Sequence, residues 1–282
     1  MRLAAAARAA VALAVAGLTV AAPPAAAVEP ALPELSIEAP PELRRHLARL
    51  DHLDRGRLAG AMELTGLDDP GPPIRLILAP EGSPLARRVA PWVAGYALAE
   101  AGTIVVFPSR AGAYPYDSLE ELVQHEVAHV LVARAAGGGE VPRWLHEGVA
   151  MTAGGAWGLE DSGRFGLSVA RQGEVPLSRL PRLFAGGGAA TARAYAVSGG
   201  FVRFLLRRHG RGVSGEILAG IAAGLPFEEA FRRAAGESLA HAEEEFWERQ
   251  TFWHRWLPLA TSSTVLWIGV TMLALLAIRR RR

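Results

Sequence analysis

The chain of 282 residues can form one large domain or two small ones, and because half of it is apolar, most of it can bury a core. It has no cysteine, which excludes disulfides, thiolate metal sites and a cysteine nucleophile. Six of the 30 basic residues lie in the first 27 and last four positions. Without these six, the chain has 24 basic and 28 acidic residues, so its net charge does not indicate nucleic-acid binding.

The first 27 residues have the pattern of a secretory signal peptide. Two arginines come before an Ala/Val/Leu run, and Ala25-Ala26-Ala27 offers a small-residue cleavage site. An uncleaved N-terminal anchor is the alternative, but the apolar run is short and prolines follow it. We therefore expect residues 1–27 to be removed.

Residues 28–69 predict a linker followed by an N-terminal helical segment. Four prolines between residues 28 and 41 favour an extended linker without regular structure. From Glu42 to Leu67, leucines recur at intervals of three to five residues, which predicts an amphipathic helix or a pair of helices.

Two short apolar segments bounded by glycine or proline then predict β-strands, Ile74 to Leu78 and Thr103 to Phe107. The residues between them predict a loop or a short helix. Strands next to a functional helix can hold an extended peptide at the sheet edge, although a purely structural sheet is the alternative.

A long helix follows, with its start and its end both marked in the sequence. Ser118 and Glu121 have the spacing of a capping box, and three glycines at 137–139 mark the end. His125 and His129 therefore fall in the middle of this helix, where their geometry is fixed by the helical backbone.

The residues His125-Glu126-x-x-His129 predict a zinc site. Two histidines four residues apart lie on one helical face, so that both rings can reach a single Zn²⁺. In this pattern Glu126 acts as the general base toward the attacking water. A third protein ligand must come from another part of the chain.

A second helix is predicted after Pro142, which suits a first helical turn. The preceding glycines allow the chain to reverse, so that Glu147 becomes the natural third ligand. His146 is the alternative ligand, but adjacent helical residues point about 100° apart, so both cannot easily bind one ion. If Glu147 binds, His146 is an outer-shell, substrate-facing or structural residue. The remaining histidines are expected at the surface: His46, His52, His209, His241 and His254.

The spacing of these residues resembles that of the gluzincin metallopeptidases. The second histidine is followed 18 residues later by Glu147 within Pro142-x-Trp144-Leu145-x-Glu147-Gly148, as in bacterial families of the peptidase MA clan with a W-L-x-E-G signature. The resemblance implies an α+β, thermolysin-like zincin core with His125, His129 and Glu147 as zinc ligands and Glu126 as base. The metzincin pattern is excluded, because positions 132 and 135 are Val and Ala instead of Gly and His.

The segment from Ala194 to Leu205 resembles the A-Y-x-x-S-x-x-F-V-x-x-L helix that follows the metal site in the same families. In related enzymes a tyrosine donates a hydrogen bond to the developing oxyanion. The resemblance implies this role for Tyr195, and packing in the core is the alternative.

The segment 257–278 carries no charge and is long enough to cross ~30 Å of hydrocarbon. Aromatic residues come just before it, and the arginines at 279–282 follow it, which predicts a single span with a cytoplasmic tail. A buried soluble helix is the alternative. This arrangement predicts an extracytoplasmic catalytic domain on a bacterial cytoplasmic membrane.

Together these features predict an α+β protein with a small sheet, a mostly helical C-terminal part, a transmembrane helix and a metallopeptidase domain over residues 70–250. The expected activity is zinc-dependent hydrolysis of peptide or protein substrates. A non-hydrolytic zinc- or peptide-binding scaffold of the cell envelope is the alternative. The sequence does not predict the substrate, endo- or exopeptidase action, or the oligomeric state.

Overall fold

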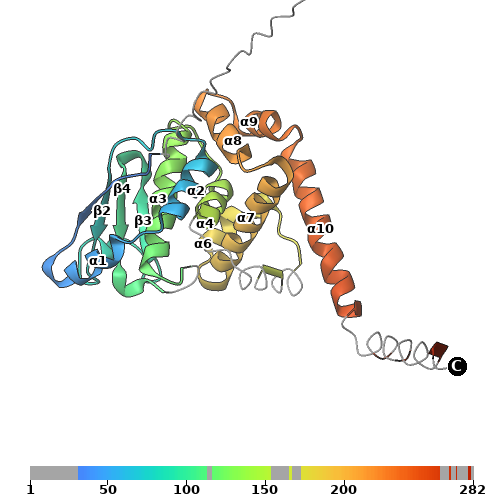
Figure 1. The fold of residues 1–282 in the computed structure, drawn as a ribbon, viewed down its shortest axis with the longest axis horizontal. Helices are drawn as coiled ribbons and strands as arrows, with labels where there is room; N and C mark the ends of the chain where they lie inside the picture. The colour runs from blue at the N-terminus through green and yellow to red at the C-terminus, as the bar shows by residue number, and fades with distance from the viewer. Residues whose placement is uncertain are drawn as a thin grey trace, which may run out of the picture.

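The computed structural model describes residues 31–112, 116–153, 165–166 and 173–260, together with positions 267, 271, 279 and 280. It contains a small mixed sheet followed by helices (Figure 1). The strands are β1 (Leu35–Glu38), β2 (Ile74–Leu78), β3 (Gly95–Leu98) and β4 (Thr103–Val106). The helices are α1 (Leu47–Leu50), α2 (Arg55–Thr65), α3 (Leu119–Ala135), α4 (Arg143–Ala153), α6 (Leu180–Ala185), α7 (Gly188–His209), α8 (Val213–Ala222), α9 (Phe227–Ala235) and α10 (Leu239–Ala260). Short 3₁₀ turns cover Pro41–His46, Ala86–Arg88, Ala99–Ala101, Pro108–Arg110 and Leu177–Arg179.

The sheet has the strand order β1-β2-β4-β3. The first three of these strands are parallel, and β3 runs antiparallel to β4 at the edge. In β2, Ile74, Leu76 and Leu78 are buried while Arg75 is exposed, which is the period-two pattern of a strand with one face in the core. A small apolar cluster that includes Val105 covers the other face of the sheet.

Helix α3 lies between the sheet and the remaining helices (Figure 1). It packs against β3 and β4 on one side and against α2 and α4 on the other, and α4 in turn packs on α7. Helix α3 is therefore buried around most of its circumference, and His125 and Glu126 are only 1% and 3% exposed.

Both ends of α3 follow the predicted signals. Ser118 Oγ accepts from the backbone N–H of Glu121, and the glutamate carboxylate accepts from the N–H of Asp117, one residue before the cap.

Several sequence predictions hold in the structure. Strands form at both predicted segments, with β4 ending at Val106, and the region from 42 to 67 forms short helical turns followed by α2. Helix α4 begins directly after Pro142, as expected. Helix α7 begins at Gly188, six residues before the predicted start at Ala194.

Two predictions about the sheet were wrong. Residues 28–41 were expected to be a linker without regular structure, but Leu35–Glu38 forms β1 and pairs with β2. The segment between the two predicted strands was expected to be a loop or helix, but it contains the edge strand β3. Strand β1 alternates apolar and polar residues, but only over four positions in a proline-rich segment, and it is held by β2, which is distant in the chain. Strand β3, Gly-Tyr-Ala-Leu, has no such alternation, and it is held by antiparallel pairing with the next strand, β4.

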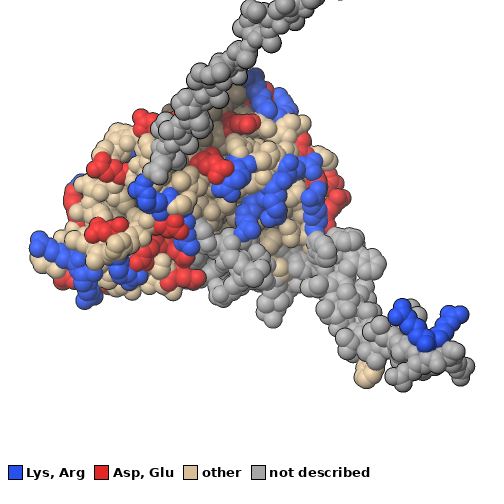
Figure 2. Space-filling view, viewed as in Figure 1, with Lys and Arg blue, Asp and Glu red and all other residues tan. Residues whose placement is uncertain are grey.

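The two predicted targeting segments fall largely outside the described residues. The expected signal peptide at 1–27 lies outside them entirely, and so does most of the expected span at 257–278, whose first four residues end α10. Among the helices that the structure describes, none combines the length and apolar character needed to cross a bilayer. The face in Figure 2 shows arginines interspersed with acidic side chains, in agreement with the composition.

Candidate metal centre

Three predicted ligands converge at the centre of the molecule. His125 and His129 lie one turn apart on α3, and their Nε2 atoms are 2.9 Å from each other. From α4, the Oε2 atom of Glu147 lies 3.6 Å from the first of these nitrogens and 3.4 Å from the second. The three side chains thus present two nitrogens and one oxygen to a common point.

These three atoms fit a divalent metal ion. Donors about 2.0–2.2 Å from a tetrahedral ion lie roughly 3.3 Å from each other, close to the observed separations. The Oε2 atom of Glu147 is buried and has no hydrogen-bond partner. Such an atom costs free energy unless a cation or donor meets it, so its orientation toward the two nitrogens supports a metal-binding role for the group.

The chain reversal between α3 and α4 brings Glu147 to this point. Gly137 and Gly138 adopt left-handed backbone conformations, with φ of 59° and 80°, which glycine reaches without steric cost. Farther along α4, Gly148 lies directly against α7. A Cβ at this position would lie 2.5 Å from the carbonyl oxygen of Ser198 and 2.4 Å from a methyl group of Val202. The glycine therefore permits the helix contact that sets the depth of Glu147.

His146 contacts His129 and is not one of the three converging residues. Its Nδ1 atom lies 2.6 Å from Nδ1 of His129, on the side of that ring opposite the converging Nε2. Burial and the charge of His129 lower the pKa of His146 to about 3, so that its ring is neutral and can accept a hydrogen bond. The contact therefore orients His129, as outer-shell partners of metal-bound histidines do.

The carboxylates near the centre have different electrostatic surroundings. Burial raises the pKa of Glu126 to about 7. Burial also opposes ionisation of Glu147, but the charge of His129 and the close approach of both imidazoles hold its pKa well below the usual range. The pKa of Glu126 is therefore raised into the range of a proton acceptor, while that of Glu147 is lowered, which suits a carboxylate that stays charged.

A cavity of about 500 Å³ opens over the centre. Glu126 lines it, as do the three converging residues and the edge strand β3. Gly95 of β3 lies close to Glu126, because a Cβ at this position would be 3.3 Å from Oε1 of that side chain. An extended ligand along β3 would thus pass directly beside this carboxylate.

Two tyrosines also line the cavity. The ring of Tyr195, on α7, lies 6.4 Å from the His125 ring, and the ring of Tyr116 lies 4.8 Å from it. Burial raises the pKa of both phenols, and the hydrogen bond between them lowers that of Tyr195 while raising that of Tyr116. Sequence reasoning missed Tyr116, since it precedes the helix cap and has no fixed spacing to the metal motif.

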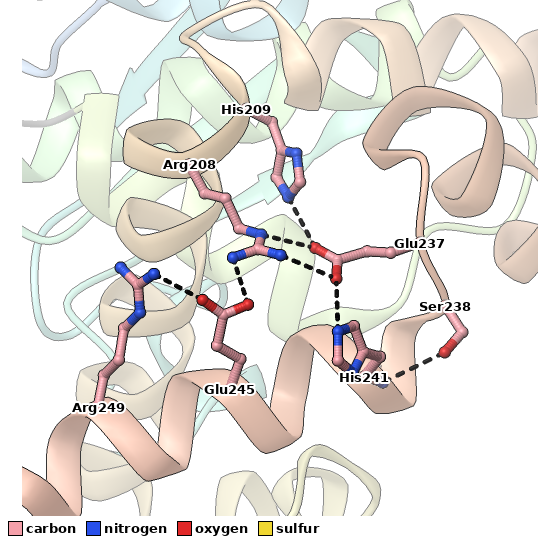
Figure 3. Close-up of polar contacts among 7 residues, drawn as sticks. All are labelled: Arg208, His209, Glu237, Ser238, His241, Glu245 and Arg249. Atoms are coloured by element: carbon pink, nitrogen blue, oxygen red, sulfur yellow. Dashed lines mark hydrogen bonds and ion pairs between the residues drawn. The ribbon is translucent and has the colours of Figure 1, made fainter.

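A second cluster contains metal-ligand types but is already paired. Glu237, His241 and Glu245 place donor atoms close together. Arg208 contacts both carboxylates, and Arg249 contacts Glu245 (Figure 3). These arginines satisfy the carboxylate charges that would otherwise attract a cation, so we interpret this cluster as a structural ion-pair network.

The same network corrects one prediction about the histidines. His209 was expected at the surface, but its side chain is only 15% exposed, and its Nε2 lies 2.9 Å from a carboxylate oxygen of Glu237. Its side chain thus helps join the end of α7 to the start of α10. His241 follows the prediction more closely, with its side chain 61% exposed.

Comparison with known families places the chain in a larger group. A family model of the Peptidase MA superfamily matches residues 89–252. The chain belongs to the Peptidase MA superfamily. No curated protein matches the chain. The matched range begins just ahead of β3 and includes α3, α4 and α7, so the site described above lies within the Peptidase MA region. The resemblance to this clan is therefore confirmed at the level of the superfamily, and peptidase activity of a metal-dependent type is the coarse function that it supports.

Proposed function

We propose that this Peptidase MA member is a zinc-dependent peptidase of the gluzincin type. The observation that carries the proposal is the convergence of two imidazole nitrogens and one carboxylate oxygen next to Glu126 in an open cavity. Two histidines and a glutamate are an established ligand set of catalytic zinc sites, which keep a further position for water or substrate. We assign His125, His129 and Glu147 as the ligands.

The residues around the ion have separate roles in the proposed reaction. When bound, zinc supplies Lewis acidity at the scissile carbonyl. Glu126 accepts the proton of the attacking water and passes it to the leaving amine. Its raised pKa suits this exchange, and a bound cation nearby would favour the ionised form that the first step requires. The Tyr195 hydroxyl stays protonated and can donate to the developing oxyanion.

Strand β3 supplies a binding edge for the substrate. In the described part of the chain it pairs with β4 alone, so its other edge is available for a peptide backbone. Gly95, Tyr96 and Ala97 all line the cavity over the centre. A peptide added as an extra strand would therefore present a backbone carbonyl beside Glu126.

We further propose that the domain is tethered outside the cytoplasmic membrane. The support comes from sequence, namely the signal-like residues 1–27, the uncharged segment 257–278 and the arginines after it. Protease added to intact spheroplasts should digest the domain and leave a C-terminal fragment protected. A domain digested only after membrane lysis would overturn this placement.

The activity is tested by comparing the zinc-loaded chain with its Glu126→Gln variant on a peptide library analysed by mass spectrometry. We expect the variant to retain one zinc ion and to lose cleavage, because an amide cannot accept the proton. A Glu147→Gln variant should lose zinc affinity as well. Hydrolysis that survives in Glu126→Gln would refute the mechanism. Stoichiometric zinc without cleavage by the unmodified chain would instead favour the non-hydrolytic scaffold.

A further inference from the structure

A second cavity, of about 610 Å³, adjoins the one over the metal centre. The two share lining residues, among them Tyr116, Tyr195 and Arg143. A peptide held beside Glu126 can therefore extend from one cavity into the other. Aromatic side chains also line the second cavity, including Phe184 and the 69%-exposed Trp92.

The described lining of this second cavity contains no acidic side chain, but it contains two arginines. One of them, Arg110, is already neutralised, since it makes two hydrogen bonds to the Glu81 carboxylate and two more to backbone carbonyls. Arg143 is different. Its only hydrogen bond among the described residues runs from Nε to Oε1 of Glu147, at 3.3 Å. Its two terminal nitrogens therefore have donors to offer.

The guanidinium of Arg143 is held in a defined orientation. It lies over the Phe184 ring, with its central carbon 4.3 Å from the ring centre. This contact and the hydrogen bond to Glu147 together restrain the planar group, and the side chain lines both cavities. The side chain is 53% exposed, so an incoming ligand can reach it. A fixed, planar fork of donors matches the two oxygens of a carboxylate.

The charges at the metal centre strengthen this selection. Among the residues that the structure describes, Glu147 is the acidic partner of Arg143, and in the proposed function its charge is directed to the metal ion. The cation and Arg143 then outweigh Glu126 and Glu147 in the joined cavities, which favours an anionic ligand. The guanidinium also contacts Glu147, one of the proposed metal ligands. An anion bound by Arg143 therefore belongs to a substrate residue next to the cleaved bond.

We infer that Arg143 is a specificity-determining residue that binds a carboxylate of the peptide substrate, next to the scissile bond, in the cavity walled by Phe184 and Trp92. This inference rests on the proposed peptidase function. The carboxylate can belong to the C-terminus of the peptide or to an aspartate or glutamate side chain. Both sources present the same pair of oxygens to the guanidinium.

The test uses the zinc-loaded full chain and two matched pairs of peptide libraries. The first pair carries a free or an amidated C-terminus, and the second carries Asp and Glu or Asn and Gln at the varied positions. We expect at least one carboxylate library to be cleaved with about tenfold or higher kcat/KM than its neutral partner. The pair that shows the preference identifies the source of the carboxylate.

Three variants then assign the preference to a residue. Arg143→Gln should bring the ratio of carboxylate to neutral peptide close to one, and Arg143→Lys should retain part of it, because the charge remains without the fork. Arg182→Gln removes the same charge from an exposed position on α6 outside the cavity lining and should keep the ratio. Since each ratio is taken within one variant, a change in zinc affinity through Glu147 cancels.

A binding measurement separates this inference from the proposed activity. The same libraries are equilibrated with the Glu126→Gln chain, with and without Arg143→Gln, and the retained peptides are counted. Selective retention of carboxylate peptides that depends on Arg143 supports the inference, even if the unmodified chain cleaves no peptide and the proposed activity fails. Equal retention of acidic and neutral peptides, or a preference that persists in Arg143→Gln, would overturn it.

Discussion

The Nδ1 atoms of His129 and His146 lie 2.6 Å apart, on two helices that meet only because the chain reverses after α3. The opposite nitrogen of His129 faces the converging ligand atoms. A metal ion bound there would leave the proton of His129 on Nδ1, from which His146 can accept it as a hydrogen bond. In the proposed zinc site, His146 would therefore fix the tautomer and the ring orientation of His129.

His146→Ala is expected to weaken zinc binding by about 10- to 100-fold, because His129 loses the acceptor that orients it. His146→Asn, which places an amide oxygen near the lost nitrogen, should restore most of the affinity. Competition with a chromophoric chelator measures both. Equal zinc affinity in the Ala variant and the unmodified chain would rule out an orienting role.

Tyr195→Phe is expected to lower kcat by about 100-fold while zinc content and unfolding free energy stay close to those of the unmodified chain, since only a hydroxyl is removed. Tyr116→Phe removes the neighbour that hydrogen-bonds this hydroxyl and should cause a smaller loss. Steady-state kinetics on one cleaved peptide gives both values. A Phe variant with full kcat would assign Tyr195 to core packing.

Gly148→Ala is expected to lower the free energy of unfolding by about 1–3 kcal/mol, because the added methyl group collides with the backbone of α7. Zinc affinity should fall as well, since Glu147 moves with its helix. Gly82→Ala is the matched control, because a Cβ there meets no atom within 4 Å. Urea denaturation in the presence of a chelator isolates the packing effect from zinc binding. Similar stabilities for the two variants would contradict the close helix contact.

Glu237→Gln is expected to destabilise the fold by about 1–3 kcal/mol, because its carboxylate is 11% exposed and contacts Arg208 and His209. Glu229→Gln is the control. It also removes a carboxylate paired with arginines, but its partners are largely exposed, so the cost should stay below about 1 kcal/mol. Zinc stoichiometry should be unchanged in both variants. Loss of a second zinc ion from Glu237→Gln would instead identify a metal site in this network.

Local sequence determined the central helix and the face that its histidines share. The cap at Ser118, the glycines after Ala136 and the helical spacing of His125 and His129 act within a few residues of each other, so the pattern is readable without the fold. The strands β2 and β4 were predictable for a related reason, since short runs rich in Ile and Val, bounded by glycine or proline, favour strands. Superfamily membership followed from the same local motifs.

Only the tertiary structure decided what surrounds that helix. Strand β1 is held by β2, far along the chain, and β3, which pairs with the next strand β4, has no apolar alternation to show it. The depth of Glu147 depends on contact between Gly148 and α7, and the positions of His146, Tyr116 and Arg143 depend on how three helices and an edge strand meet. These positions are set by side-chain packing between distant segments, whereas periodicity reports only neighbours on one element.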